Sequence, residues 1–157
     1  ITPGARVLEP SAGTGSLVEA LVEAGARVTA LELQADRAAY LRAAWEGRGV
    51  KVHAADFLAY GASADFDAVV MNPPFSVAGR RYTDIEHVRH AMSLVRPGGR
   101  VVAIMAAATP TRDEPKALRF REDIRAWHPV WEPVEAKRFR LSGTDVPTVL
   151  LTLTRPA

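Results

Sequence analysis

Short apolar runs alternate with amphipathic stretches along most of this 157-residue chain. The apolar runs have the length of buried strands, and the stretches between them have the three-to-four-residue spacing of helices. Strands separated by helices lie parallel to one another, because a parallel neighbour needs a long crossover connection. The pattern therefore predicts an α/β fold with a doubly wound, mostly parallel sheet.

The boundaries of the expected elements come from turn residues and caps. The expected strands are residues 6–9, 27–32, 51–55, 66–71 and 100–107. The expected helices are residues 16–24, 36–46, 84–95 and 120–127, the first ended by Gly25 and the second capped by Asp36. A Thr- and Leu-rich strand closes the chain after a hairpin-like connection at Gly143. The two strands on either side of this connection should be antiparallel to each other, because no helix separates them.

Length and composition exclude several classes of protein. The length fits one domain, residues 1–157, with a sizeable core. The absence of cysteine excludes disulfides, thiolate chemistry and cysteine-ligated metals. No apolar run is long enough for a transmembrane helix and the start has no signal-peptide pattern, so we expect a cytoplasmic protein with no membrane partner. The first residue is Ile1 rather than Met, which is compatible with truncation at the N-terminus.

Charge is distributed unevenly along the chain. Residues 1–75 carry 6 Lys and Arg against 9 Asp and Glu, net −3, whereas residues 76–157 carry 14 against 9, net +5. A basic half favours a polyanionic partner, and a solvated surface is an even alternative. The chain has 17 Arg against 3 Lys, 11 prolines and a single asparagine, which fits either a heat-adapted protein or biased codon usage.

The chain's only asparagine stands in the stretch VVMNPPFS, directly after the strand expected at 66–71. Pro73 and Pro74 lack backbone donors and fix two φ angles, so they end the strand and leave nearby carbonyls free. The side chain of Asn72 can both accept and donate hydrogen bonds. Such a cluster can bind an amino group, but taken alone it is also a common strand-to-loop turn.

Polar side chains come at or just after the ends of four expected strands. These residues are Glu9, Glu32, Asp56 and Asn72. Ligands of open parallel sheets bind beyond the carboxyl ends of the strands, so we expect the four side chains to line one rim. By its position, Glu32 can accept both hydroxyls of a ribose, and Asp56 can accept from an exocyclic amine.

The turn EPSAGTGS, residues 9–16, joins the first strand to the first helix. Gly13 and Gly15 permit close backbone approach and unusual φ angles, so a nucleotide can sit here. The spacing is not GxGxxG, and no lysine follows to make a phosphate-binding loop. Glu9 would repel a phosphate, which favours a ligand with a cationic or neutral group near this turn.

These segments resemble, in order, the motifs of class I S-adenosylmethionine-dependent methyltransferases. VLEPSAGTGSLVEAL resembles their first motif, ALELQ the acidic second-strand motif, ADF the third and NPPF the fourth. NPPF is similar to the (N/D)PP(Y/F) catalytic motif of the amino-methyltransferases. Among these enzymes, the motif sequences of adenine-specific DNA methyltransferases are the most similar. The resemblance spans nearly the whole chain and implies a Rossmann-like sheet with an antiparallel last strand.

The resemblance implies S-adenosyl-L-methionine as the cofactor and assigns its binding residues by position. The methionine part would lie on the first turn, at Glu9, Pro10, Ser11, Ala12, Gly13 and Gly15. Glu32 would bind the ribose, and Asp56 and Phe57 the adenine, with Leu33 packing nearby.

The same resemblance implies a catalytic motif made of Asn72, Pro73, Pro74 and Phe75, with Asn72 also counted among the cofactor-binding residues. The Asn72 side chain and the Pro73 carbonyl would accept hydrogen bonds from the target amine. Phe75 would stack on the extruded base.

The substrate implied by the resemblance is the exocyclic amino group of adenine in DNA. Nucleic acid is therefore the expected partner, DNA ahead of RNA. One alternative is an amino group in RNA or a glutamine amide of a protein, because the motif can bind any planar amine. Another is a non-catalytic cofactor-binding module of a larger assembly. No separate target-recognition domain is evident, so specificity would come from a specificity subunit, a homodimer, flanking residues or the loops.

Other polar residues suggest weaker hypotheses. His87 and His90 lie three residues apart on the helix expected at 84–95, and without a third ligand we expect no metal site and solvent-facing or partly buried histidines. Basic residues follow the catalytic motif and the strand expected at 100–107. They are Arg80, Arg81, Arg112, Lys116, Arg119 and Arg121. Both loops should open on the cofactor rim, as phosphate contacts or as a polar lid.

Overall fold

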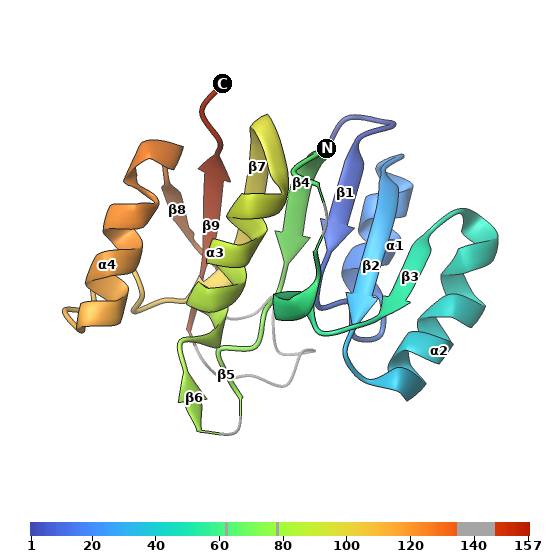
Figure 1. Cartoon of the computed structure of the whole chain (residues 1–157), viewed down its shortest axis with the longest axis horizontal. Helices are drawn as coiled ribbons and strands as arrows, with labels where there is room; N and C mark the ends of the chain where they lie inside the picture. The colour runs from blue at the N-terminus through green and yellow to red at the C-terminus, as the bar shows by residue number, and fades with distance from the viewer. Residues whose placement is uncertain (62, 78, 135–146) are drawn as a thin grey trace.

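A seven-stranded sheet forms the centre of the computed structural model, which describes all residues except 62, 78 and 135–146 (Figure 1). The strands are β1 (Arg6–Glu9), β2 (Arg27–Glu32), β3 (Lys51–Ala54), β4 (Phe66–Met71), β7 (Val95–Ala106), β8 (Val130–Pro133) and β9 (Thr148–Thr154). Their order in the sheet is β3-β2-β1-β4-β7-β9-β8. β9 is antiparallel to both of its neighbours, and the pairs from β3 to β7 are parallel. The predicted α/β sheet with an antiparallel last strand is confirmed.

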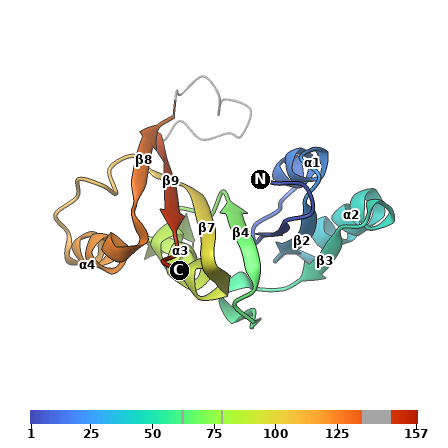
Figure 2. The ribbon, with the colours of Figure 1, turned by 90° about the horizontal axis from the view of Figure 1, so that it is seen from above.

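Helices cover both faces of this sheet. They are α1 (Ser16–Glu23), α2 (Ala35–Trp45), α3 (Thr83–Leu94) and α4 (Pro115–Asp123). Successive strand residues point to opposite faces, so Val7 joins the core under α1 and α2, whereas Leu8 joins the core under α3 and α4. Figure 2 shows the two pairs of helices on opposite sides of the sheet.

Three helices begin earlier than the sequence predicts, α3 by a single residue at Thr83. α2 begins at Ala35 with Gln34 as its N-cap, so Asp36 lies inside the first turn and the prediction of Asp36 as the cap was wrong. Gln34 N donates instead to Glu32 Oε1 at 2.8 Å, which places the start of the helix directly behind β2. α4 begins at Pro115 rather than near residue 120, because the fixed φ of proline suits the first helical position.

Two strands also differ from expectation. β7 begins at Val95, directly after α3, and not at Arg100. The residues from Val95 to Arg100 already run alongside β4, and the pairing of the two strands shifts its register between Phe66 and Ala68. A Cβ on Gly99 would lie 2.9 Å from the Asp67 carbonyl, so glycine permits this close approach. β8 was not expected as a strand, and it pairs with β9. The connection expected at Gly143 lies outside the described residues.

The parallel strands end together at one edge of the sheet, called here the carboxyl edge and seen at the bottom of Figure 1. A small antiparallel ladder, β5 (Ser76–Val77) with β6 (Arg80–Arg81), projects from this edge where the sequence predicted a loop. In the part of the chain that the structure describes, no helix is long and apolar enough to cross a membrane.

Candidate functional site

A cavity of about 480 Å³ opens at the carboxyl edge, and Glu32, Asp56 and Asn72 line it. This main cavity has the size of sites that bind small molecules and cofactors. A small recess of about 250 Å³, lined by Glu9, shares Ser11, Gly13 and Asn72 with the main cavity. The four polar side chains expected on one rim therefore line two adjoining hollows.

Eleven of the fourteen residues predicted for the site line one or both hollows, and the exceptions are Gly15, Pro73 and Phe75. Gly15 is the point where the first turn packs against Trp45 of α2, since a Cβ there would lie 2.8 Å from Trp45 Nε1. Pro73 is buried, and Phe75 is half-buried. The Phe75 carbonyl accepts a hydrogen bond from Thr83 N at 3.3 Å, which fixes the start of α3 against the predicted catalytic motif.

Glu9 is buried at the end of β1 with an incomplete set of hydrogen bonds. Its Oε1 accepts from Ser11 N at 3.1 Å, whereas Oε2 is buried without a partner. Burial raises the pKa of Glu9 to about 8; the Ser11 hydrogen bond opposes the rise, and the nearby charge of Glu32 adds to it. A cation bound beside this carboxyl would favour its ionised form, so the recess suits a positively charged group.

Glu32 connects the end of β2 to the first turn. Its Oε2 accepts from Gly13 N at 2.9 Å and its Oε1 from Gln34 N at 2.8 Å. A carboxylate has about four acceptor positions, so both oxygens can still accept from a ligand. Gly13 and Gly15 have φ angles of 54° and 96°. These are left-handed values, which glycine adopts readily, and the sequence predicted unusual φ angles at both positions.

The opposite wall of the main cavity comes from the residues after β3. Asp56 is exposed, and its Oδ1 accepts from Leu58 N at 2.9 Å, which caps a 3-10 turn. Phe57 is only 3% exposed and packs against the rings of His87 and His90. Only a small part of the Phe57 ring therefore faces the cavity, whereas the Leu33 side chain at the mouth is largely exposed.

The site includes residues that the sequence did not assign to it. Thr83 and His87 lie one turn apart on α3 and both line the main cavity, as does Val77 from the small ladder. Arg80 of the same ladder also lines it, and the sequence had predicted that its loop opens on the cofactor rim. Contrary to expectation, His87 is buried; its Nδ1 has no partner, and burial lowers its pKa. The four-residue spacing of Thr83 and His87 was a usable signal, but it did not show which face of the helix meets the cavity. Among the described residues, no three His, Asp or Glu side chains come close enough to hold a metal ion.

Residues 7–99 match the sequence profile of a family described as "Methyltransferase domain". The matched segment is more than half of the chain. The chain belongs to this methyltransferase family. The methyltransferase domain contains β2 to β4, all of β1 but its first residue, and α1 to α3, and therefore all of the residues that line the main cavity.

Two curated relatives are similar in sequence to this methyltransferase domain. Ribosomal RNA small subunit methyltransferase C of Chromohalobacter salexigens is 36% identical over 110 residues, which cover 68% of this chain and 33% of that protein. The tRNA1(Val) (adenine(37)-N6)-methyltransferase of Aliivibrio fischeri is 33% identical over 107 residues, covering 60% of this chain and 44% of that protein. The chain thus spans less than half the length of either relative.

Solved methyltransferase structures share the fold. An rRNA methylase from Streptococcus thermophilus superposes with a TM-score of 0.66 at 13% identity, covering 100% of this chain and 90% of that chain. The 1,6-didemethyltoxoflavin-N1-methyltransferase of Burkholderia thailandensis, solved with S-adenosylhomocysteine, has a TM-score of 0.69 at 20% identity, covering 99% and 72%. S-adenosylmethionine is the cofactor of this methyltransferase domain.

The residues at the carboxyl edge fit this cofactor. Its amino acid part carries an ammonium group, which matches the unpartnered, buried carboxyl of Glu9. Its ribose carries two hydroxyl donors, which match the free acceptor positions of Glu32. A long ligand can occupy the small recess and the main cavity together, because they share Ser11, Gly13 and Asn72.

Proposed function

We propose that this domain methylates the exocyclic amino group of a base in RNA, with N6 of adenine as the target. The observation that carries the proposal is the position of Asn72, exposed at the end of β4 on the shared wall of both hollows. From the sequence we expected adenine in DNA. The names of the two relatives specify ribosomal RNA and transfer RNA, and one specifies adenine N6, so they favour the RNA alternative.

The exocyclic amine that would accept the methyl group is a weak nucleophile, so the site must increase its reactivity. The exocyclic amine of adenine shares its lone pair with the ring, and S-adenosylmethionine supplies an electrophilic methyl group on a sulfonium sulfur. In our proposal the Asn72 side-chain oxygen and the Pro73 carbonyl accept hydrogen bonds from the two N–H groups of the amine. Two acceptors held in this way favour a localised lone pair, so the residues contribute by positioning and electrostatics.

The two prolines keep this arrangement rigid. Neither proline has a backbone N–H, so neither can continue the hydrogen-bonded ladder of β4. Pro73 is buried and Pro74 lines the main cavity, so the backbone that follows Asn72 is anchored in the core while the Asn72 side chain itself faces both hollows. We propose that the target base leaves its stack of neighbouring bases and packs on the exposed part of Phe75, which follows the cavity-lining Pro74 in the chain. In an unpaired RNA loop this costs less than in a duplex.

We expect Asn72→Ala to reduce kcat for methyl transfer to RNA by about 10²- to 10³-fold, the effect of removing one polar group that stabilises a transition state. Tritiated cofactor measures transfer, and calorimetry measures cofactor affinity separately. Asn72→Asp is the matched variant, because aspartate keeps an acceptor oxygen at the same place. Full activity in Asn72→Ala would rule out the mechanism.

The substrate is tested with matched RNA and DNA oligonucleotides and a glutamine-containing peptide, followed by digestion and identification of the methylated product. N6-methyladenosine from RNA is the expected result. Methylated deoxyadenosine alone would favour the DNA substrate, and methylated glutamine would favour a protein substrate. Tight cofactor binding without transfer to any of the three would favour a non-catalytic module.

A further inference from the structure

Cationic groups from three segments gather around Tyr82 at the carboxyl edge. The Cζ atoms of Arg81 and Arg112 lie 5.2 Å and 5.7 Å from the centre of the Tyr82 ring, and Lys116 Nζ lies 5.7 Å from it. Arg81 belongs to β6, Arg112 precedes α4, and Lys116 belongs to α4. Arg80 of β6 lines the main cavity. These five residues are called here the Tyr82 cluster.

The backbone of the Tyr82 cluster is tied to the predicted catalytic motif. Thr83 N donates to the Phe75 carbonyl at 3.3 Å, and Thr83 Oγ1 donates to the Arg80 carbonyl at 3.2 Å. Tyr82 itself has a φ of 67°, a left-handed conformation that costs a residue with a side chain about 1–2 kcal/mol. The chain therefore holds Tyr82 in a strained conformation at the junction of the catalytic loop and α3.

The cluster remains positively charged after its ion pairs are counted. Glu86 pairs with Lys116 at 2.7 Å and with Arg80 at 2.9 Å, and Glu114 lies 4.0 Å from Arg81. Four cations against the two carboxylates of these ion pairs leave a net charge of +2. The buried carboxyl of Asp84, which interacts with Arg112, reduces this charge but leaves the cluster with an excess of cations. The side chains of Arg80 and Arg81 are 68% and 70% exposed, so a large part of each can still reach a ligand.

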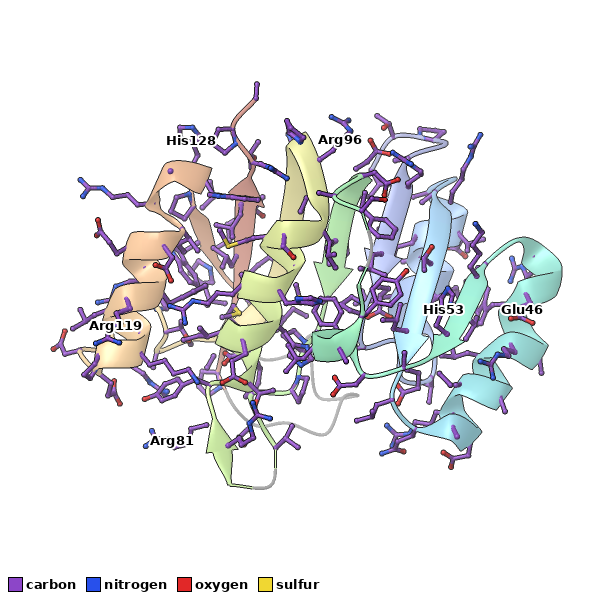
Figure 3. The ribbon with its side chains drawn as sticks, viewed as in Figure 1. Glu46, His53, Arg81, Arg96, Arg119 and His128 are labelled. Atoms are coloured by element: carbon purple, nitrogen blue, oxygen red, sulfur yellow. The ribbon has the colours of Figure 1, made fainter. Side chains whose placement is uncertain are left out.

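The cluster lies at the end of the molecule where the substrate must enter. In Figure 3 Arg81 lies at the carboxyl edge, whereas Arg96 lies at the opposite edge of the sheet. Val77 and Arg80, from the two strands of the small ladder, line the main cavity. A strand whose base occupies the cavity would therefore carry its neighbouring phosphates past the Tyr82 cluster.

We propose that the Tyr82 cluster binds the phosphodiester backbone of the nucleotides next to the methylated base, and so holds a single-stranded RNA over the cavity. This inference rests on the proposed function. Guanidinium groups match phosphate geometry with two parallel hydrogen bonds, and Arg81 and Arg112 supply two such groups from different segments. Phosphate contacts carry no sequence information, so the cluster fixes the position of the strand and not the choice of sequence.

The test is the salt dependence of binding to an unstructured RNA oligonucleotide with one adenine, in the presence of S-adenosylhomocysteine. Each phosphate contact to a single strand contributes about 0.7 to the slope of log K against log salt. We expect the double variant Arg81→Gln, Arg112→Gln to reduce the slope by about 1.4 and the affinity at 0.1 M salt by about 20-fold. At saturating RNA, kcat should stay within about twofold, because the cluster does not touch the reacting atoms.

Two control variants separate charge from fold. Arg48→Gln removes an exposed arginine that also stacks on an aromatic ring, 4.7 Å from the centre of Trp45, and the slope should not change. Arg81→Lys with Arg112→Lys keeps the charge and should restore most of the slope. A slope in the Gln double variant equal to that of wild type would overturn the inference, as would a lysine variant that behaves like the glutamine variant.

The outcomes also distinguish this inference from the proposed function. If wild type methylates the RNA and the Gln double variant matches it in slope and KM, only the role of the Tyr82 cluster is wrong. If wild type neither binds nor methylates RNA, the proposed function fails and the inference fails with it. A DNA oligonucleotide of the same sequence is tested in parallel. If DNA binds more tightly than RNA and its binding depends on the Tyr82 cluster, the cluster does contact phosphates, but RNA is the wrong ligand.

Discussion

Glu9 shows how a single residue can be placed for a ligand at a cost to the unliganded fold. Its pKa of about 8 means that the folded domain keeps a proton on Glu9 over a pH range in which the unfolded chain, near 4.5, has lost it. The native state therefore binds more protons than the unfolded state between these values. Its free energy of unfolding must then fall as the pH rises.

We predict that the free energy of unfolding of wild type, minus that of Glu9→Gln, decreases between pH 5 and pH 8. The decrease should approach about 1.4 kcal/mol per pH unit and level off above the folded pKa. Glutamine has a similar shape and does not titrate, so other groups cancel in the difference. Urea denaturation of both proteins without cofactor measures it. A difference independent of pH would show that Glu9 is ionised in the folded domain.

At the scale of elements, the first turn depends on packing against a helix from a later part of the chain. A Cβ on Gly15 would lie 2.8 Å from Trp45 Nε1 and 3.0 Å from Leu41 Cδ2, both on α2. The sequence showed that Gly15 follows the first strand and can adopt an unusual φ. It did not show that Trp45 and Leu41 of α2 contact the turn at Gly15, because that contact depends on how α2 packs on the sheet.

We predict that Gly15→Ala destabilises the domain by about 2–5 kcal/mol. A left-handed φ costs alanine about 1–2 kcal/mol, and displacing Trp45 or Leu41 adds about 1–3 kcal/mol. Gly49→Ala is the matched control, because Gly49 has a φ of 86° but open space around its Cβ position. Gly49→Ala should cost only the conformational part. Equal losses in thermal or urea denaturation would remove the steric argument for Gly15.

At the scale of the whole molecule, the site is assembled from the ends of strands that are distant in sequence. Glu9, Glu32, Asp56 and Asn72 meet only when β1 to β4 are in register. A ligand that contacts several of them binds the native state and not the unfolded chain. It must therefore stabilise the whole domain by mass action.

We predict that S-adenosylhomocysteine at 100 times its dissociation constant stabilises the domain by about 2.7 kcal/mol. For a domain of this size the unfolding midpoint should rise by about 5–10 °C in a thermal scan. Glu32→Ala should lose most of the shift at the same concentration of ligand, whereas Arg48→Gln should keep it. A full shift in Glu32→Ala would remove Glu32 from the cofactor site.

The sequence by itself determined the fold class, every strand of the main sheet except β8, and most of the polar residues of the rim. These features are local, because alternation of strands and helices sets the sheet, and a polar residue after a buried strand must lie at the carboxyl edge. Tertiary structure decided the rest. The unpartnered Oε2 of Glu9, the buried ring of His87 and the convergence of Arg81 and Arg112 on Tyr82 depend on contacts between distant segments, which no local pattern records.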